Sequence, residues 1–255
     1  NLIEETEIQP RSRLRNIAVP FPFDSYPNMP PTRPLSPMRS PSIEDYLKAV
    51  YKLEEQSGGP PVSTGAVADA MEVSSASASN MIKRLDELGF LSYEAYEGAT
   101  LTDPGRTVAL EVIRHHRLLE LYLKEVMGFS WDEIHEEAEI LEHHISERFE
   151  ARIEEMLGHP ERDPHGHPIP ARDGTVDELP TRSLAGLGEG EAAHIDHIAD
   201  ESGELLDLLE QRGLLPGATV EVVDTRPLDG LFVVAVDGDE QLIGQPVAQK
   251  VVVTS

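Results

Sequence analysis

The residues best suited to chemistry lie in the stretch 134–144, where carboxylates and imidazoles recur at helical spacing. Side chains three and four positions apart are neighbours on a helix, so His135, Glu139, Glu142 and His143 would share one side of it. Two carboxylates and an imidazole one turn apart can converge on a single cation. This spacing is typical of a metal site, but in a chain with 47 acidic residues a glutamate-rich helix face is also typical of solvated surface.

The composition limits both the ligands and the partners. The chain has no cysteine, so disulfides and thiolate sites are excluded and a metal would be held by oxygen and imidazole nitrogen. A net charge of −26 opposes nonspecific attraction to nucleic acid or to an anionic membrane, so any DNA contact needs a local favourable patch. There is no apolar run of membrane-spanning length and no signal-peptide pattern. We therefore expect a cytoplasmic protein without a membrane partner.

A helix must carry the central row of carboxylates and imidazoles. The apolar residues Ile134, Ala138, Leu141 and Ile145 recur at intervals of three and four, which predicts a helix with one buried side. The same pattern continues beyond these residues, so we expect a single helix that ends at Gly158.

A second long helix is predicted from Asp103 to Gly128. Asp103 fits an N-cap, and Pro104 fits the first helical position. His116 and Glu120 are four residues apart and share a face of this helix. A lone histidine on such a helix is more often a buried hydrogen-bonding residue than a ligand, so spacing alone does not assign His116 to a metal.

Residues 41–102 predict a winged helix-turn-helix. A first helix begins at Ser42 as its N-cap, and two shorter helices follow, one from Ser63 and one over 75–88, separated by a short turn. Two β-prone runs after Gly89 form the hairpin that would be the wing. This order of elements favours a DNA-binding domain over a bundle with a polar outer face.

The second helix of the pair would be the recognition helix. Small hydroxyls and an amide suit base edges and phosphates, and two cations suit phosphate. Acidic residues are nearly absent within this stretch but surround it, so we expect weak DNA binding until something fixes the geometry. The candidate DNA-contacting residues are Ser74, Ser75, Ser77, Ser79, Asn80, Lys83 and Arg84.

The remaining segments differ in character. Residues 1–40 are rich in proline and contain five arginines, which predicts a disordered tail, either a basic arm that touches DNA phosphate or an extension without a role. Residues 159–182 predict a proline-rich linker, although they contain three histidines. From about residue 183, short strand candidates with glycine turns and a helix at 203–211 predict a small β-barrel.

Taken in this order, these elements resemble the diphtheria toxin repressor family of metal-dependent transcription regulators. The resemblance covers residue 41 to the end and includes His116-x-x-x-Glu120, Glu139-x-x-Glu142-His143 and the run 162–170. It is strongest for the manganese-responsive branch that keeps a C-terminal domain. It implies an α+β fold with a winged helix-turn-helix at 41–102, a helical metal-binding and dimerisation domain at 103–158, a linker at 159–182 and an SH3-like (FeoA-like) barrel at 183–255.

The resemblance also implies two metal sites. The primary site would contain Asp45, Glu139, Glu142 and His143. The ancillary site would contain His116, Glu120 and His135, with Glu201 and Glu204 reaching over from the C-terminal domain.

The donor types favour one metal over another. Asp45 and Glu139 are carboxylates where iron-responsive relatives carry methionine and cysteine, and hard oxygen donors suit Mn(II), with Fe(II) second. Lys48 lies where small manganese regulators carry a glutamate for a second ion. This difference favours two separated sites over a tight two-metal cluster.

The function implied is a homodimer that binds a palindromic operator in double-stranded DNA and represses metal-uptake genes when manganese is bound. An enzyme is the main alternative, because carboxylate and histidine clusters also serve hydrolases and di-iron oxidases. However, His135-Glu136-x-x-Glu139 lacks the second histidine of zinc proteases, and the predicted helices have no Glu-x-x-His pair. A metal-delivery or scaffold protein leaves the winged helix unexplained, so we expect a regulator and not an enzyme.

Overall fold

The structure is a computed structural model, and it describes residues 40–131, 133–177, 180–199, 202–226 and 228–254. The predicted tail lies outside these residues apart from Ser40. Within the described part of the chain, no helix combines the length and the apolar character needed to cross a membrane.

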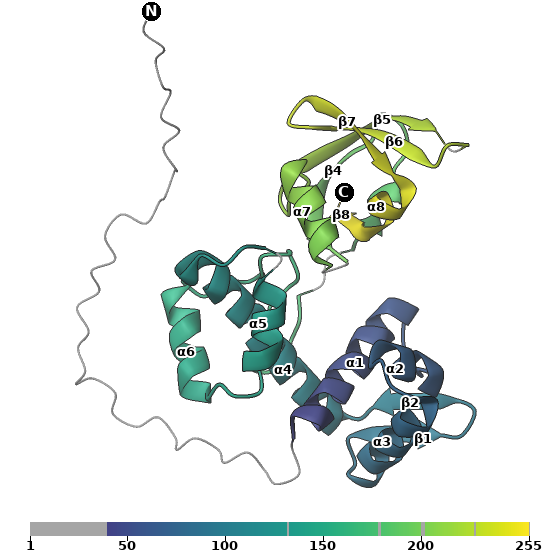
Figure 1. The fold of residues 1–255 in the computed structure, drawn as a ribbon, viewed down its shortest axis with the longest axis vertical. Coiled ribbons are helices and arrows are strands. Elements are labelled where there is room, and N and C mark those ends of the chain that lie inside the picture. The colour runs from purple at the N-terminus through teal and green to yellow at the C-terminus, as the bar shows by residue number, and fades with distance from the viewer. Residues whose placement is uncertain (1–39, 132, 178–179, 200–201, 227, 255) are drawn as a thin grey trace, which may run out of the picture. The chain divides into compact units, whose positions relative to one another are not determined.

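The predicted winged helix-turn-helix is confirmed (Figure 1). Its elements are α1 (Pro41–Ser57), α2 (Thr64–Ala70), α3 (Ser75–Glu87) and the antiparallel pair β1 (Leu91–Glu94) and β2 (Gly98–Leu101). Ser63 and Ser74 cap α2 and α3, because each side-chain oxygen accepts a hydrogen bond from a backbone N–H of the first turn. Helix α1 begins at Pro41, before the predicted N-cap Ser42, because proline tolerates the first turn, where its missing N–H costs nothing.

Helix α4 (Asp103–Tyr122) follows the wing and continues as a π-helical turn, η1 (Leu123–Met127). The N-cap is Thr102 and not Asp103, because the Thr102 hydroxyl accepts a hydrogen bond from the backbone N–H of Gly105. Gly128 ends the helical run with φ 76°, the left-handed conformation that glycine adopts at helix C-termini.

The prediction of one continuous helix up to Gly158 is wrong. The structure has α5 (Ile134–Leu141) and α6 (Glu147–Met156), with a turn between them. Ser146 adopts an extended backbone and accepts a hydrogen bond from the N–H of Phe149, so it starts a new helix although the apolar period continues through it. Glu142 and His143 therefore lie in the turn after α5.

The C-terminal region contains a six-stranded antiparallel sheet with the strand order β3-β8-β4-β5-β6-β7. The prediction of a small strand-rich domain here is confirmed, but its sheet is not a closed barrel, because β3 and β7 are the two ends of the sheet and do not pair with each other. Alternating apolar residues identify strands but do not determine whether the first and last strands meet. The elements are β3 (Arg182–Ser183), η2 (Leu184–Gly186), β4 (Ala192–Ile198), α7 (Gly203–Gln211), β5 (Thr219–Arg226), β6 (Leu231–Val236), β7 (Asp239–Gly244), α8 (Gln245–Lys250) and β8 (Val251–Thr254).

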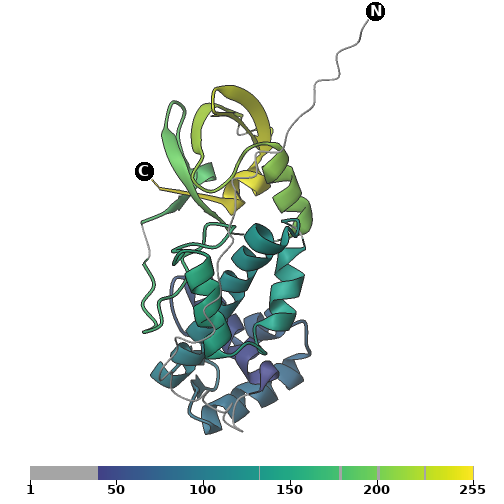
Figure 2. The ribbon, with the colours of Figure 1, turned by 90° about the vertical axis from the view of Figure 1, so that its left-hand side faces the viewer.

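The sheet has one helix-covered apolar core. Helix α7 lies beside the strands in both views (Figures 1 and 2), and its Leu206 and Leu209 belong to the same buried cluster as Val220 and Val222 of β5. The turn between β6 and β7 contains Asp237-Gly238, both with positive φ, as two-residue hairpin turns require.

Candidate metal centre

The first group of candidate ligands lies where α1 meets the turn after α5. Helix α4 contacts both α1 and α5, which brings these two distant segments together. His143 Nε2 lies 2.7 Å from Asp45 Oδ1, and its Nδ1 lies 2.7 Å from Glu44 Oε2. The same Nε2 is 3.4 Å from Glu142 Oε1. The structure thus brings Asp45, Glu142 and His143 together, and it adds Glu44, which the sequence did not single out.

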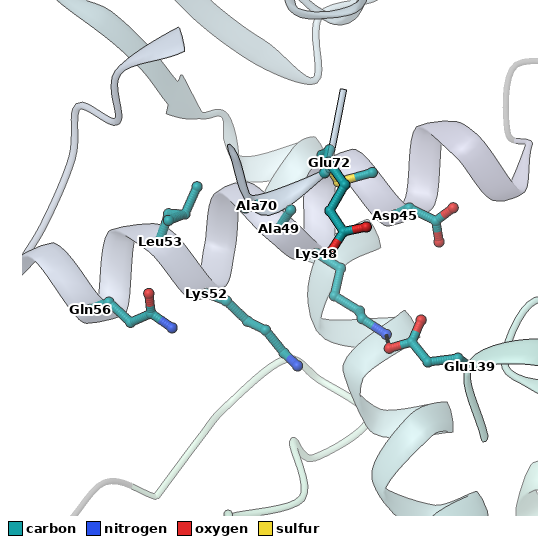
Figure 3. A pocket seen from close by; sticks show the side chains of 10 residues that line it. Asp45, Lys48, Ala49, Lys52, Leu53, Gln56, Ala70, Glu72 and Glu139 are labelled. Atoms are coloured by element: carbon teal, nitrogen blue, oxygen red, sulfur yellow. Dashed lines mark hydrogen bonds and ion pairs between the residues drawn. The ribbon is translucent and has the colours of Figure 1, made fainter. Parts of the chain in front are cut away.

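Glu142 is the central side chain of this group. Glu142 is only 1% exposed, and its Oε2 lies 2.7 Å from His116 Nδ1. Lys48 Nζ donates to both Glu142 oxygens at 2.8 Å and to Glu139 Oε1 at 2.6 Å. Figure 3 shows Lys48 reaching from α1 to Glu139, with Asp45 nearby on the same helix. Glu139 therefore pairs with Lys48, and it lies 3.8 Å from His116 Nδ1.

The second group lies between α4 and α5. His116 Nε2 is 2.9 Å and His135 Nδ1 is 3.3 Å from the same atom, Glu120 Oε1, and Glu120 is fully buried. Glu204 lies exposed in the first turn of α7, and no three-residue group of possible ligands among the described residues includes it. The predicted Glu201 lies outside the described residues.

One buried histidine was passed over in the sequence. His165, in the segment interpreted as a linker, is fully buried and stacks on Trp131 with ring centroids 5.5 Å apart. Its Nδ1 lies 3.6 Å from Glu120 Oε2, and Asp163 Oδ1 accepts its backbone N–H. The segment also places Ile169 in the core. The only local signal was the Asp-x-His pair, which is weak between prolines.

The pKa values of the imidazoles show how strongly these groups are coupled. Burial, the largest influence, would lower the pKa of His143, but hydrogen bonds to Asp45 and Glu44 and the charge of Glu142 raise it to about 10. Burial likewise opposes a raised pKa at His116, but Glu120 and then Glu142 raise it to about 9. Both imidazoles are therefore protonated at neutral pH in the metal-free protein.

The pKa values of the carboxyls shift the other way. Burial would raise the pKa of Glu120, but the charge of His116 holds it well below its usual range. Burial also opposes a lowered pKa at Glu139, but Lys48 is the main cause that lowers it. The Glu120 and Glu139 carboxyls are thus ionised. Their negative charges are offset by the protonated His116 and by Lys48.

The donor sets fit a hard divalent cation. Ligand atoms lie within 4.8 Å of one another in Asp45-Glu142-His143, His116-Glu139-Glu142, His116-Glu120-His135 and Glu120-Asp163-His165. All the atoms are carboxylate oxygens or imidazole nitrogens, the donors that Mn(II) and Fe(II) accept, and imidazole protons are released when a metal binds.

The candidate DNA-contacting residues lie on α3. Ala78, Ile82 and Leu85 face the core, so the opposite side of the helix is free for solvent. Ser74 also serves the fold, because its hydroxyl caps α3 and lies 2.9 Å from the hydroxyl of Ser77. Ser79 is partly exposed, and the exposed candidates are Ser74, Ser75, Ser77, Asn80, Lys83 and Arg84.

Sequence comparison identifies the family. Residues 38–99 match the N-terminal DNA-binding domain of iron-dependent repressors, 102–171 match their metal-binding and dimerisation domain, and 182–255 match the FeoA domain. The iron-dependent repressor IdeR of Mycobacterium leprae is 31% identical over 214 residues, covering 79% of this chain and 91% of that protein. The chain belongs to the iron-dependent repressor family.

Two further relatives support this family. The diphtheria toxin repressor of Corynebacterium jeikeium is 28% identical over 213 residues, covering 74% of this chain and 87% of that protein. A manganese-dependent transcriptional repressor solved in complex with manganese is 39% identical, with a TM-score of 0.78 over 84% of this chain and 99% of that one. The expected family of metal-dependent transcriptional repressors, with a C-terminal FeoA domain, is therefore confirmed.

Proposed function

We propose that this iron-dependent repressor family member is a dimeric repressor of metal-uptake genes that Mn(II) activates. The observation that carries the proposal is the contact between Asp45 of α1, in the DNA-binding part, and His143 after α5. This contact joins residues 38–99, which match the DNA-binding domain of the family, to residues 102–171, which match its metal-binding and dimerisation domain. A cation at this junction would act on both regions.

The proposed primary ligands are Asp45, Glu139, Glu142 and His143. The ligand atoms of Asp45, Glu142 and His143 lie within 4.8 Å of one another. Glu139 lies beside this group, because Lys48 donates hydrogen bonds to both Glu139 and Glu142. The proposed ancillary ligands are His116, Glu120 and His135. Glu201 and Glu204 are the proposed additions from the C-terminal domain, and the exposure of Glu204 does not support its part in this set.

A bound divalent cation supplies positive charge at a junction that contains four carboxylates. Glu44 and Asp45 come from α1, and Glu139 and Glu142 come from α5 and its turn, so the four groups repel one another across the junction unless cations or protons offset them. Asp45 and His143 hold α1 in one position when this repulsion is offset. Because α1 packs with α2, it transmits that position to the helix-turn-helix.

Dimerisation fits the exposed apolar residues of the second region. Within residues 102–171, which match a dimerisation domain, five large apolar side chains are between 46% and 64% exposed. Large apolar side chains that are exposed in an isolated chain are commonly covered at a protein interface. We propose that a second copy of this chain covers these residues: Val126, Met127, Ile140, Phe149 and Met156.

A dimer accounts for how the recognition helices meet DNA. Two copies of α3 about 34 Å apart would enter adjacent major grooves of a palindromic operator. Asn80 would contact base edges, and Lys83 and Arg84 would contact phosphate. The other proposed contacts on this helix are Ser74, Ser75, Ser77 and Ser79.

Iron(II) is the second candidate metal. The named iron-dependent relatives favour it, whereas the oxygen-rich primary ligands and the absence of cysteine favour Mn(II). Titrating operator binding with each metal under anaerobic conditions separates the two. We expect the parent protein to respond to Mn(II) at the lower concentration.

The proposed function is tested by DNA binding of the parent protein and of Glu142→Ala, with and without a chelator. We expect the parent to bind its operator only with the metal and Glu142→Ala to lose this response, because its buried carboxylate is removed. The matched control is Glu137→Gln, an exposed glutamate of α5, which should respond as the parent does. Equal DNA affinity of the parent with and without a chelator would refute the proposal.

A further inference from the structure

Carboxylate oxygens surround the Lys48 ammonium as they would surround a bound metal ion. Its ammonium nitrogen lies 2.6 Å from Glu139 Oε1 and 2.8 Å from each oxygen of Glu142. These are short, charge-assisted hydrogen bonds from one cation to three carboxylate oxygens. Glu139 and Glu142 also belong, with His116, to a group whose ligand atoms lie close enough together to hold one metal ion.

The ammonium is held in place by burial as well as by charge. The Lys48 side chain is 8% exposed and that of Glu142 is 0% exposed, so both charges lie away from water and each is offset by the other. Burial alone would lower the pKa of Lys48, but the charges of Glu142 and Glu139 outweigh it and raise that pKa. Lys48 therefore stays charged in this setting.

The ammonium uses the same oxygen atoms as one candidate metal group. In His116-Glu139-Glu142, the His116 Nδ1 atom is 3.8 Å from Glu139 Oε1 and 2.7 Å from Glu142 Oε2. Lys48 Nζ donates to both of these oxygens. An ammonium and a divalent ion cannot share these oxygens closely, because both carry positive charge.

Lys48 also connects two regions of the chain. It lies on α1, whereas Glu139 lies on α5 and Glu142 in the turn after it. The three hydrogen bonds therefore join α1 to α5 without any metal. The contact between Asp45 and His143 joins the same two regions.

We propose that the Lys48 ammonium is a tethered cation of the metal centre, which holds α1 against α5 in the metal-free protein and competes with the incoming ion for Glu139 and Glu142. This inference rests on the proposed function. Lys48 sets the metal concentration at which the repressor switches, because the ion binds only as the ammonium gives up these oxygens.

The test compares Mn(II) binding by the parent, Lys48→Met and Lys48→Arg, measured from the electron paramagnetic resonance signal of free Mn(II). We expect Lys48→Met to lower the dissociation constant of the tightest site by about tenfold or more, which corresponds to about 1.4 kcal/mol. Lys48→Arg keeps the positive charge and should bind Mn(II) as the parent does. Lys48→Gln replaces Lys48→Met if the latter does not fold.

The matched control is Lys52→Met, one turn further along α1 and directed to the same side in Figure 3, which should leave the dissociation constant unchanged. A second readout is hydrogen exchange of the α1 amides in the presence of a chelator, which should be faster in Lys48→Met than in the parent. Unchanged or weaker Mn(II) binding by Lys48→Met would overturn the inference. If the parent and Lys48→Met both bind no Mn(II), the proposed function itself fails.

Discussion

His143 Nε2 lies 2.7 Å from Asp45 Oδ1, so a residue of the first described helix touches one that follows α5. The Nδ1 atom of the same ring lies 2.7 Å from Glu44, which fixes the ring between two carboxylates of α1. This contact makes the position of α1 sensitive to whatever binds the imidazole and the carboxylate. We propose that in this metal-dependent repressor the contact links the metal to the DNA-binding helices.

Asp45→Asn should uncouple the two regions. The amide keeps the size of the side chain but removes its negative charge, so a hard cation loses an anionic ligand. We expect the metal-dependent gain in DNA affinity, about 5- to 150-fold for a typical coupling between sites, to fall to about onefold. DNA affinity in chelator should stay at the parent's level. Fluorescence anisotropy with labelled operator measures both values, and a full metal response in Asp45→Asn would contradict the ligand assignment.

Arg84→Ala should change the salt dependence of DNA binding. Each lost phosphate contact reduces the slope of log affinity against log salt by about 0.9, so a dimer should lose about 1.8. Affinity should fall for operator and for unrelated DNA alike, because phosphate contacts carry no sequence information. The control is Arg226→Ala, an exposed arginine of β5, which should leave the slope unchanged. An unchanged slope for Arg84→Ala would remove this residue from the DNA interface.

The spacing of residues predicted much of this fold, because helices and hairpin turns depend on residues that are close together along the chain. The helical period predicted α5, and the hairpin turn at Asp237-Gly238 follows from residue types that tolerate positive φ. The break before Ser146 was missed, because a capping hydroxyl competes with a continuing apolar period. The open sheet was missed because the pairing of its end strands is a long-range property.

The same limit applies to the candidate metal centre. Spacing placed Glu139, Glu142 and His143 together, and only the family resemblance connected them to Asp45. The partnership of Lys48 with Glu142 joins residues 94 positions apart, and no local pattern indicates it. The burial of His165 was equally hidden, because its neighbours in the sequence are one proline and one glycine.

The contact between α4 and the wing predicts opposite effects for two glycine substitutions. A Cβ on Gly105 would lie 1.9 Å from the backbone oxygen of Phe90, which is impossible without moving the helix or the backbone just before β1. Gly105→Ala should therefore lower the free energy of unfolding by about 1–3 kcal/mol. At Gly65, in α2, the nearest atom to a new Cβ is 3.8 Å away, so Gly65→Ala should raise that free energy by about 0.4–1 kcal/mol.

Chemical denaturation in the presence of a chelator measures both glycine variants without a contribution from the metal. The two substitutions add the same methyl group to helical positions, so they control for each other. If both changed stability in the same direction, the close approach of α4 to Phe90 would be wrong.

Glu150 gives the metal-free protein a stability that depends on pH. It is 3% exposed, Arg114 Nε donates to its Oε1 at 2.6 Å, and His115 Nε2 lies 3.4 Å from its Oε2. Burial would raise the pKa of Glu150, but His115 and Arg114 lower it from 4.5 to about 2. The carboxyl binds a proton more weakly in the folded chain than in the unfolded chain, so its contribution is present above pH 4.5 and lost as the pH falls through about 2.

Glu150→Gln should remove this pH dependence, because an amide does not titrate. A downward shift of this size corresponds to roughly 3 kcal/mol. The variant should therefore be less stable than the parent at pH 7, and the gap should narrow by about that amount between pH 4.5 and pH 2. Denaturation of both proteins in chelator at constant ionic strength measures the gap, with the exposed Glu136→Gln of α5 as the control. A gap that stays constant down to pH 2 would mean that the Glu150 carboxyl is not stabilised by Arg114 and His115.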